Sequence, residues 1–289
     1  MTKILIAGAN GYIGTFLVNN LSNNFDIIPV GRNLSDFHGT FNKGIQQDLA
    51  NPWNFSVEPD IIIYAAAQHY FSTTLPTPEN FFKSNVQSLS NALTFAKLSK
   101  TKLFIYLSTI SVLGQITDQI IDENTPVKNP SLYGATKLLG ERMLHEFGAA
   151  IPSIIIRLPG VVGPNLPSDR PWLNKIVKLF KEGQEVKYYN PYSQFNNICD
   201  VQTICDFVRH LTFQKITKSF TIINLAGSEP MRMCDVINFL RKRLKSTSLV
   251  TSTEAEKISF TIDISTISTE YNFQPPATRR ILTRFIDNL

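Results

Sequence analysis

The stretch Gly8-Ala9-Asn10-Gly11-Tyr12-Ile13-Gly14 decides the fold of this 289-residue chain. It follows a short apolar run at 3–7, typical of a buried strand, and it opens a helical pattern over 12–21. Glycines at such a junction permit a tight turn, a close approach of backbone N–H groups to a phosphate, and tight packing of the helix on the sheet. Because helix N-termini favour anions, the stretch predicts a dinucleotide-binding turn.

Outward from this turn, strand patterns alternate with helix patterns. Strands are predicted at 3–7, 25–30, 44–46, 61–64, 103–107, 154–156 and 220–225. Helices are predicted at 12–21, 80–98, 131–147 and 233–244, and an amphipathic stretch carries Leu173, Ile176, Val177 and Phe180. This alternation predicts the α/β class, with a Rossmann-type doubly wound parallel sheet.

The alternation weakens after Gly163-Pro164, where prolines, aromatic residues and polar segments follow. We therefore expect a dinucleotide-binding domain formed by 1–164 together with about 195–227. A smaller C-terminal substrate lobe, interleaved with it, is expected from about 165–194 and 228–289.

Composition excludes several classes of protein. The chain is 43% hydrophobic and 18% charged, which is too apolar for a disordered chain. It has neither an apolar run long enough to span a membrane nor a signal peptide, and its three cysteines have no C-x-x-C spacing, so we expect a cytoplasmic protein without a metal. The net charge of +5 favours anionic partners such as phosphates and nucleotides. No aromatic residues interleave with the basic stretches, and no nucleic acid or membrane partner is expected.

The segment Tyr133-Gly134-Ala135-Thr136-Lys137 places a phenol and an ammonium one helical turn apart, on one face. A free tyrosine has a pKa of about 10, and a nearby cation favours its phenolate. Such a tyrosine can exchange a proton with a carbinol oxygen while hydride moves at carbon. Tyr133 and Lys137 are therefore candidate catalytic residues.

Hydroxyl groups follow the predicted strand at 103–107. Ser108, Thr109 and Ser111 lie at its carboxyl end, where ligands bind in open parallel sheets. A hydroxyl there can hydrogen-bond a substrate carbonyl and stabilise a developing oxyanion. Position alone does not select one of the three.

Together these motifs resemble the extended branch of the short-chain dehydrogenase/reductase superfamily, in its nucleotide-sugar epimerase/dehydratase group. The resemblance runs from residue 4 to about 164 and selects Thr109 as the catalytic hydroxyl, five residues before Gly114. It implies that Asp48-Leu49 contacts adenine, that Ala65-Ala66-Ala67 passes under the cofactor, and that the segment 157–164 covers the nicotinamide. The residues implied to bind the cofactor are Gly8, Asn10, Gly11, Tyr12, Ile13, Gly14, Arg32, Asn33, Asp48, Leu49, Ala65, Ala66, Ala67, Lys137 and Pro159.

Departures from the family pattern narrow the chemistry. An acid after the second strand would select NAD, but Arg32 follows Gly31 and can pair with a 2′-phosphate, so NADP(H) is favoured over NAD(H). Ile110 and Ser111 replace the acid pair of the dehydratases, and Ser111 replaces a cysteine of the epimerase-reductases. Gly160 stands where many relatives have an asparagine that contacts the sugar nucleotide.

The resemblance implies an NADP(H)-dependent reductase of a 4-keto nucleotide sugar, in polysaccharide or deoxysugar biosynthesis. An NAD-dependent nucleotide-sugar 4-epimerase is the alternative, and a non-catalytic NADP-binding regulatory protein is the reading from outside the enzyme class. Arg232 and Lys175 are candidates for contacting the substrate pyrophosphate. A homodimer is expected to form through the helices at 80–98 and 131–147.

Overall fold

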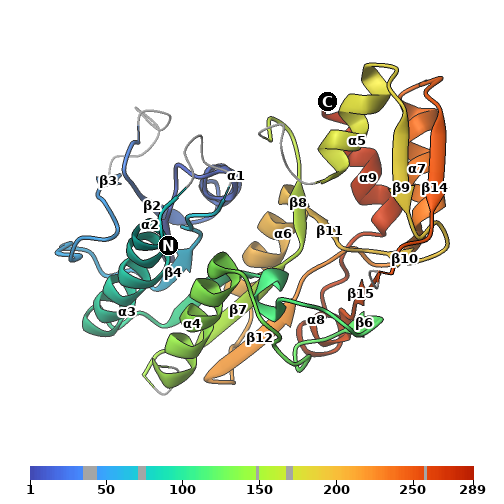
Figure 1. The fold of residues 1–289 in the computed structure, drawn as a ribbon. Helices are drawn as coiled ribbons and strands as arrows, with labels where there is room; N and C mark the ends of the chain where they lie inside the picture. Colours follow the sequence, from blue (N-terminus) through green and yellow to red (C-terminus); the bar gives the residue numbers. More distant parts are fainter. Residues whose placement is uncertain (35–43, 71–75, 148–149, 167–171, 257–258) are drawn as a thin grey trace. The chain divides into compact units, whose positions relative to one another are not determined.

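The computed structural model describes residues 1–34, 44–70, 76–147, 150–166, 172–256 and 259–289 (Figure 1). The chain divides into two compact units. The first is formed by 1–114, 127–157 and 205–223, and the second by 115–126, 158–204 and 224–289.

The first unit contains a seven-stranded sheet in the order β12-β7-β5-β4-β1-β2-β3. Its strands are β1 (Lys3–Ala7), β2 (Asp26–Gly31), β3 (Ile45–Gln46), β4 (Ile61–Tyr64), β5 (Leu103–Thr109), β7 (Ser153–Leu158) and β12 (Phe220–Asn224). β1 pairs in parallel with β2 and with β4, and β2–β3 and β4–β5 are parallel as well. The chain order reverses beside β1, which is the point in a doubly wound sheet where a ligand crevice forms.

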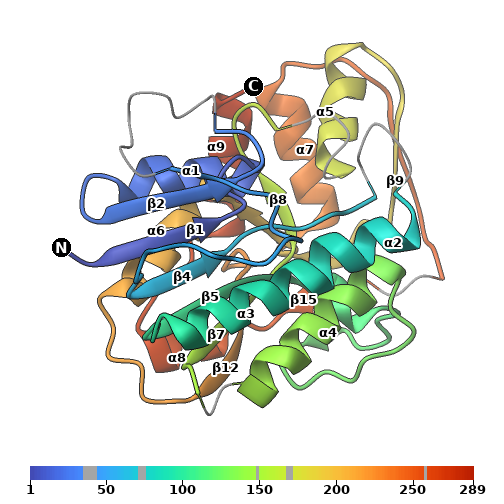
Figure 2. The same cartoon turned by 90° about the vertical axis from the view of Figure 1, so that its left-hand side faces the viewer.

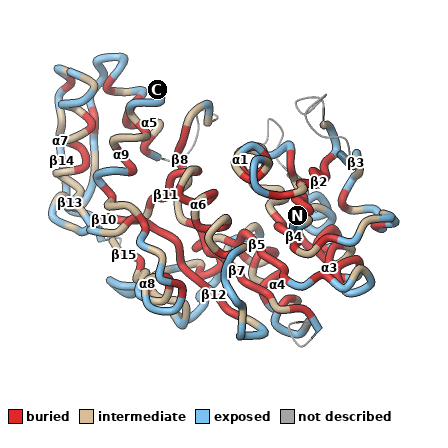
Figure 3. The backbone as a smooth tube through the Cα atoms, turned by 180° about the vertical axis from the view of Figure 1, so that it is seen from behind, coloured by how far each residue is buried: buried red, intermediate tan, exposed pale blue. Residues whose placement is uncertain are grey.

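Helices cover both faces of this sheet. They are α1 (Tyr12–Leu21), α2 (Pro78–Phe81), a π-helical segment η2 (Phe82–Gln87), α3 (Ser88–Leu98), a 3₁₀ turn η3 (Ile110–Leu113), α4 (Leu132–Phe147) and α6 (Val201–Thr212), whose first residues belong to the second unit. Figure 2 shows α3 and α4 side by side on one face, with α1 and α6 on the other. Because the strands are covered on both faces, their side chains are almost wholly buried, as the red tube of Figure 3 shows.

The predicted α/β class and Rossmann-type sheet are confirmed. The helix expected at 80–98 begins earlier, at Pro78, because Thr77 and Asn80 form a capping box with a proline at the first helical position. It is also not uniform, since η2 widens the helix for one turn before α3. Helix α6 has no counterpart among the predicted helices, although its apolar residues recur at helical spacing.

The second unit is built from short strand pairs and helices around its own apolar core. Its elements are β6 (Ile120–Ile121), β8 (Gly160–Val162), α5 (Trp172–Lys181), β9 (Val186–Tyr189), β10 (Gln194–Phe195), β11 (Ile198–Asp200), β13 (Met231–Arg232), α7 (Met233–Arg243), β14 (Val250–Thr253), β15 (Thr261–Ile262), α8 (Ser265–Tyr271) and α9 (Thr278–Asp287). The pairs β8–β11, β9–β14 and β6–β15 are parallel, and β10–β13 is antiparallel. The amphipathic stretch predicted around Leu173 is α5, whose apolar face lies in this core.

The boundaries of the units differ from the predicted domains. The segment of the first unit that begins at 127 ends at Arg157, before Gly163-Pro164. The segment 115–126 belongs to the second unit. β8 explains the earlier boundary, because it pairs with β11 instead of extending the large sheet. The expected lobe includes 167–171, which lie outside the described residues, and its role in binding substrate stays a prediction.

Replacing Gly14 with alanine is expected to destabilise the first unit by about 1–3 kcal/mol, as overpacking a close-packed site does. A Cβ at Gly14 would overlap the Gly8 carbonyl group, with the carbonyl carbon at 2.8 Å and the Ala9 Cα at 3.0 Å. Gly11→Ala is the matched control, because its Cβ would meet only the Gly8 oxygen, at 3.2 Å. Urea unfolding followed by circular dichroism measures both; equal midpoints for the two variants would contradict the expectation.

Candidate active site

The glycine-rich turn joins β1 to α1, and at Gly8 and Gly14 it leaves no space for a Cβ. Gly8 has φ of 82° and lies so close to the chain after β4 that a Cβ would come within 2.7 Å of the Ala66 nitrogen. The N–H groups of Gly8 and Ala9 donate to the Val30 carbonyl of β2 at 2.9 and 3.1 Å. Gly11 is the N-cap of α1 and gives its first turn no side-chain hydrogen bond. The turn therefore presents a helix N-terminus with little side-chain cover, which fits a pyrophosphate.

The end of β2 lies against this turn. Gly31 is buried, and a Cβ there would overlap the Asn10 side-chain oxygen. An acidic side chain therefore does not fit at Gly31 unless Asn10 moves. Arg32 and Asn33 follow and are exposed, and within the described part of the chain Arg32 forms no ion pair.

The ends of β3 and β4 carry the residues expected beside adenine and the cofactor. The exposed Asp48 carboxylate accepts the Ala50 N–H at 3.1 Å, while the Leu49 side chain is buried in the core. After β4, the Ala65 N–H donates to the Ala7 carbonyl at 2.9 Å, and Ala66 packs on Gly8. This small-residue segment thus lies directly beside the glycine-rich turn.

The end of β5 separates the three hydroxyl candidates. Ser108 is buried and donates to Glu141 Oε1 at 2.6 Å, so its hydroxyl is used within the core. Thr109 Oγ1 accepts the Ser111 N–H at 3.1 Å, capping η3, and donates to Ser111 Oγ at 3.2 Å. Thr109 and Ser111 are thus the hydroxyls left outside the core, and the Thr109 assignment stays a prediction.

Helix α4 brings Tyr133 and Lys137 to the end of β5. Gly134 packs on η3 so closely that a Cβ would lie 3.0 Å from the Ser111 carbonyl carbon. Lys137 is buried, and its Nζ donates to the Leu107 carbonyl at 2.7 Å and lies 3.9 Å from the centre of the Tyr106 ring. Burial lowers the pKa of Lys137 to about 7, because desolvation outweighs the attraction of Glu141. Tyr133 is only half-buried and lies one helical turn before Lys137.

A buried ion pair fixes α4 against the sheet. Glu141 Oε2 accepts from Arg157 on β7 at 2.8 Å, and Oε1 accepts from Arg157 Nε at 3.1 Å. With the Ser108 hydroxyl, this network ties α4 to β5 and β7 one turn beyond Lys137.

Sequence reasoning missed one residue of this region, His69, in the segment after β4. Its ring lies 6.4 Å from that of Tyr133, with the planes at 86°. Asn85 holds the neighbouring Gln68 by its backbone. No local signal in the sequence marks His69, because its neighbour Tyr133 is far along the chain.

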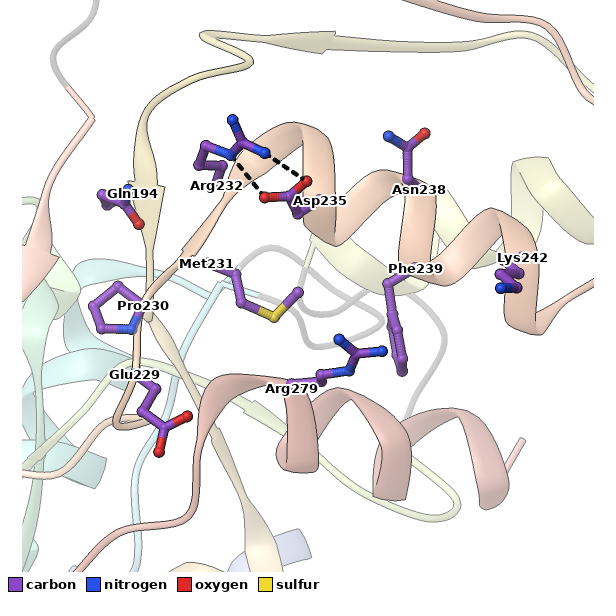
Figure 4. A pocket seen from close by; sticks show the side chains of 10 residues that line it. All are labelled: Gln194, Glu229, Pro230, Met231, Arg232, Asp235, Asn238, Phe239, Lys242 and Arg279. Carbon is purple, nitrogen blue, oxygen red and sulfur yellow. Dashed lines mark hydrogen bonds and ion pairs between the residues drawn. The ribbon is translucent and has the colours of Figure 1, made fainter.

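The second unit holds Pro159 and Gly160, both half-buried at the start of β8, and a separate cavity of about 610 Å³ (Figure 4). Arg232 lines this cavity and is held by Asp235, with nitrogen–oxygen distances of 2.8 and 3.2 Å. Lys242 and Arg279 also line it, and Arg279 lies over the Phe239 ring. A pyrophosphate at Arg232 would have to compete with the Asp235 carboxylate, and its assignment as a substrate ligand stays a prediction.

Two kinds of feature are absent from the residues that the structure describes. No helix among them is long and apolar enough to cross a membrane. No cluster of three or more His, Cys, Asp or Glu side chains within those ranges is arranged to hold a metal ion.

Comparison with known proteins adds a family match. Residues 4–226 match the model of the NAD dependent epimerase/dehydratase family. The chain is 22% identical to Protein CapI of Staphylococcus aureus, over 84% of this chain and 83% of that protein, and 23% identical to UDP-glucuronate 4-epimerase 2 of Arabidopsis thaliana, over 94% and 72%. A solved structure of UDP-glucuronic acid 4-epimerase from Bacillus cereus with NAD shares the fold, with a TM-score of 0.83 at 22% identity over 99% of this chain and 98% of that one.

Proposed function

Since the chain belongs to the NAD dependent epimerase/dehydratase family, we propose that it is an NADP(H)-dependent oxidoreductase that reduces the keto group of a 4-keto nucleotide sugar. The proposal rests on the end of β2. Gly31 supplies no acid there, a Cβ at this position would displace the Asn10 side-chain oxygen, and the next side chain is the exposed Arg32. A guanidinium there pairs with a 2′-phosphate, which only NADP(H) carries.

The glycine-rich turn supports a dinucleotide, because a Cβ at Gly8 or Gly14 would fill the space where the backbone turns into α1. Arg32 and Asn33 would take the ribose phosphate, Asp48 the adenine, and Ala65, Ala66 and Ala67 would line the cofactor. When bound, the nicotinamide supplies hydride to the carbonyl carbon of the substrate. The resemblance to the family implies further cofactor contacts from Asn10, Gly11, Tyr12, Ile13, Leu49 and Pro159.

The protein groups would handle the carbonyl oxygen. Thr109 would donate a hydrogen bond to it and hold it in place. Tyr133 would give its proton to this oxygen as it becomes an alkoxide, leaving an alcohol and a phenolate. Lys137, one turn along α4, would favour that phenolate when it is protonated, and it would hold the nicotinamide ribose.

A nucleotide-sugar 4-epimerase is the second candidate, favoured by the similarity to UDP-glucuronate 4-epimerases. An epimerase keeps its NAD and returns the hydride to the sugar, so it consumes no reductant. Native mass spectrometry of the purified protein separates the two: we expect NADP(H), bound reversibly. Retained NAD together with interconversion of UDP-sugar epimers would replace the reductase by the epimerase.

Replacing Arg32 with alanine is expected to weaken NADPH binding roughly 10- to 100-fold, the usual worth of a hydrogen bond to a charged group, and to leave NADH binding nearly unchanged. Fluorescence titration with each cofactor measures the two dissociation constants. Arg142→Ala removes an exposed arginine of α4 and serves as the control. An equal loss for NADPH and NADH in Arg32→Ala would contradict the 2′-phosphate assignment.

We further propose a cytoplasmic homodimer acting in polysaccharide or deoxysugar biosynthesis. The helices expected at the dimer interface carry large apolar side chains that are exposed in the single chain. These are Phe82 on η2, Leu98 on α3, and Leu132 and Leu139 on α4. Pairing α3 and α4 with a second copy would remove this surface from water.

A further inference from the structure

His69 and Tyr133 form an aromatic pair within the first unit. His69 lies in the segment after β4, and Tyr133 lies in the first turn of α4. Their ring centres are 6.4 Å apart and their planes meet at 86°, which is the edge-to-face arrangement that aromatic rings favour. An ionisable ring therefore packs directly on the phenol that the proposed reaction uses.

The residues on either side of His69 contact α2 and η2, the helical segments that precede α3. The Gln68 N–H donates to Asn85 Oδ1 at 2.7 Å, and Asn85 Nδ2 donates to the Gln68 carbonyl at 3.0 Å. On the other side, the Tyr70 ring lies 4.9 Å from that of the fully buried Phe81. Because both neighbours are fixed, the backbone that carries His69 is fixed as well.

The same asparagine joins this segment to α4. Asn85 Nδ2 also donates to Thr136 Oγ1 at 3.0 Å, and Thr136 Oγ1 donates to the Tyr133 carbonyl at 2.9 Å. Asn85 is 1% exposed, so these bonds lie away from solvent competition. One buried side chain thus sets the backbone of His69 and that of Tyr133 relative to each other.

We propose that His69 is a positioning residue for Tyr133, which holds the phenol ring by edge-to-face packing in the orientation from which it gives up its proton. This inference rests on the proposed function of Tyr133 as proton donor. It predicts that the rate of keto-sugar reduction depends on an aromatic ring at position 69.

Two substitutions separate packing from charge. His69→Ala removes both, and we expect kcat for NADPH-dependent reduction of UDP- and dTDP-linked 4-keto sugars to fall roughly 10- to 100-fold with KM little changed. His69→Phe keeps an aromatic ring, and we expect it to recover most of kcat.

His145→Ala is the matched control. His145 lies on the same helix as Tyr133 and has the same edge-to-face geometry, 86° against Phe220, but far from Tyr133 along α4. We expect it to keep the wild-type kcat. Wild-type kcat in both His69 variants, a loss in His69→Phe as large as in His69→Ala, or a change in KM alone would overturn the proposal.

A measurement without turnover distinguishes this proposal from the proposed function. The solvent-perturbation difference spectrum of tyrosine, with that of Tyr133→Phe subtracted, reports how far water reaches the Tyr133 ring. We expect His69→Ala to raise this signal, because the packed ring is gone, and His69→Phe to leave it near the wild-type value. An unchanged signal in His69→Ala overturns the role of His69 whatever the substrate is. Full turnover in Tyr133→Phe would instead overturn the proposed function.

Discussion

Tyr133→Phe is expected to lower kcat for keto-sugar reduction by roughly 10²- to 10⁴-fold, the usual contribution of a positioned general acid. The substitution removes only the phenol oxygen and its proton, so the phenol that would protonate the substrate alkoxide is missing. The loss of NADPH absorbance, followed at saturating substrate, measures kcat. Binding of NADPH should change little, because the assigned cofactor contacts lie elsewhere.

Tyr192→Phe is a suitable control, since it removes the same atom from a side chain of the second unit that is 73% exposed. It should keep wild-type turnover. Undiminished turnover in Tyr133→Phe would contradict the assignment for the reductase and for the epimerase alike, because both use the phenol for proton transfer. Cofactor binding with no turnover in the wild-type protein, on any keto sugar, would instead favour the non-catalytic reading.

Glu141→Gln is expected to cost about 3–5 kcal/mol of stability, the usual result of removing one partner of a buried ion pair. The Glu141 and Arg157 side chains are only 2% and 5% exposed, so the substitution leaves a guanidinium without its counter-charge in the core. It also removes the charge that opposes the burial-induced fall in the pKa of Lys137. Urea unfolding monitored by circular dichroism measures the loss.

The matched control is Glu79→Gln, which breaks the exposed pair with Lys83 and should leave the unfolding midpoint unchanged. A double variant, Glu141→Gln with Arg157→Met, should recover part of the stability because no charge is then left unpaired. Equal midpoints for Glu141→Gln and Glu79→Gln would show that the buried network contributes little.

The large sheet could be predicted because its signals are local. A strand buried on both faces is a short apolar run, as at 61–64, and such runs need no knowledge of their neighbours. The short pairs of the second unit could not be predicted in this way. β8 and β11 are three residues each, and they pair across 38 positions of sequence from Gly160 to Ile198. No local pattern specifies such a partner.

Helix α6 shows a different limit. Its apolar residues recur at helical spacing, but no glycine or proline lies between Pro191 and Gly227 to mark where the helix begins and ends. The compact unit changes at Arg157, before the predicted domain boundary at Gly163-Pro164, for a related reason. The sequence of β8 is apolar like that of a sheet strand, and only its pairing with β11 assigns it to the second unit.

The amino-acid sequence by itself determined the glycine-rich turn, the alternating sheet, and the residue types Thr109, Tyr133 and Lys137 at their spacing, because strand, turn and helix preferences act over a few neighbouring residues. The tertiary structure decided what depends on distant contacts. In the folded protein Ser108 donates to Glu141, and Gly31 lies against the Asn10 side chain. The Lys137 ammonium nitrogen lies over the Tyr106 ring, and the His69 ring packs on that of Tyr133. These outcomes follow from packing and desolvation among residues far apart in the chain, and no local pattern carries that information.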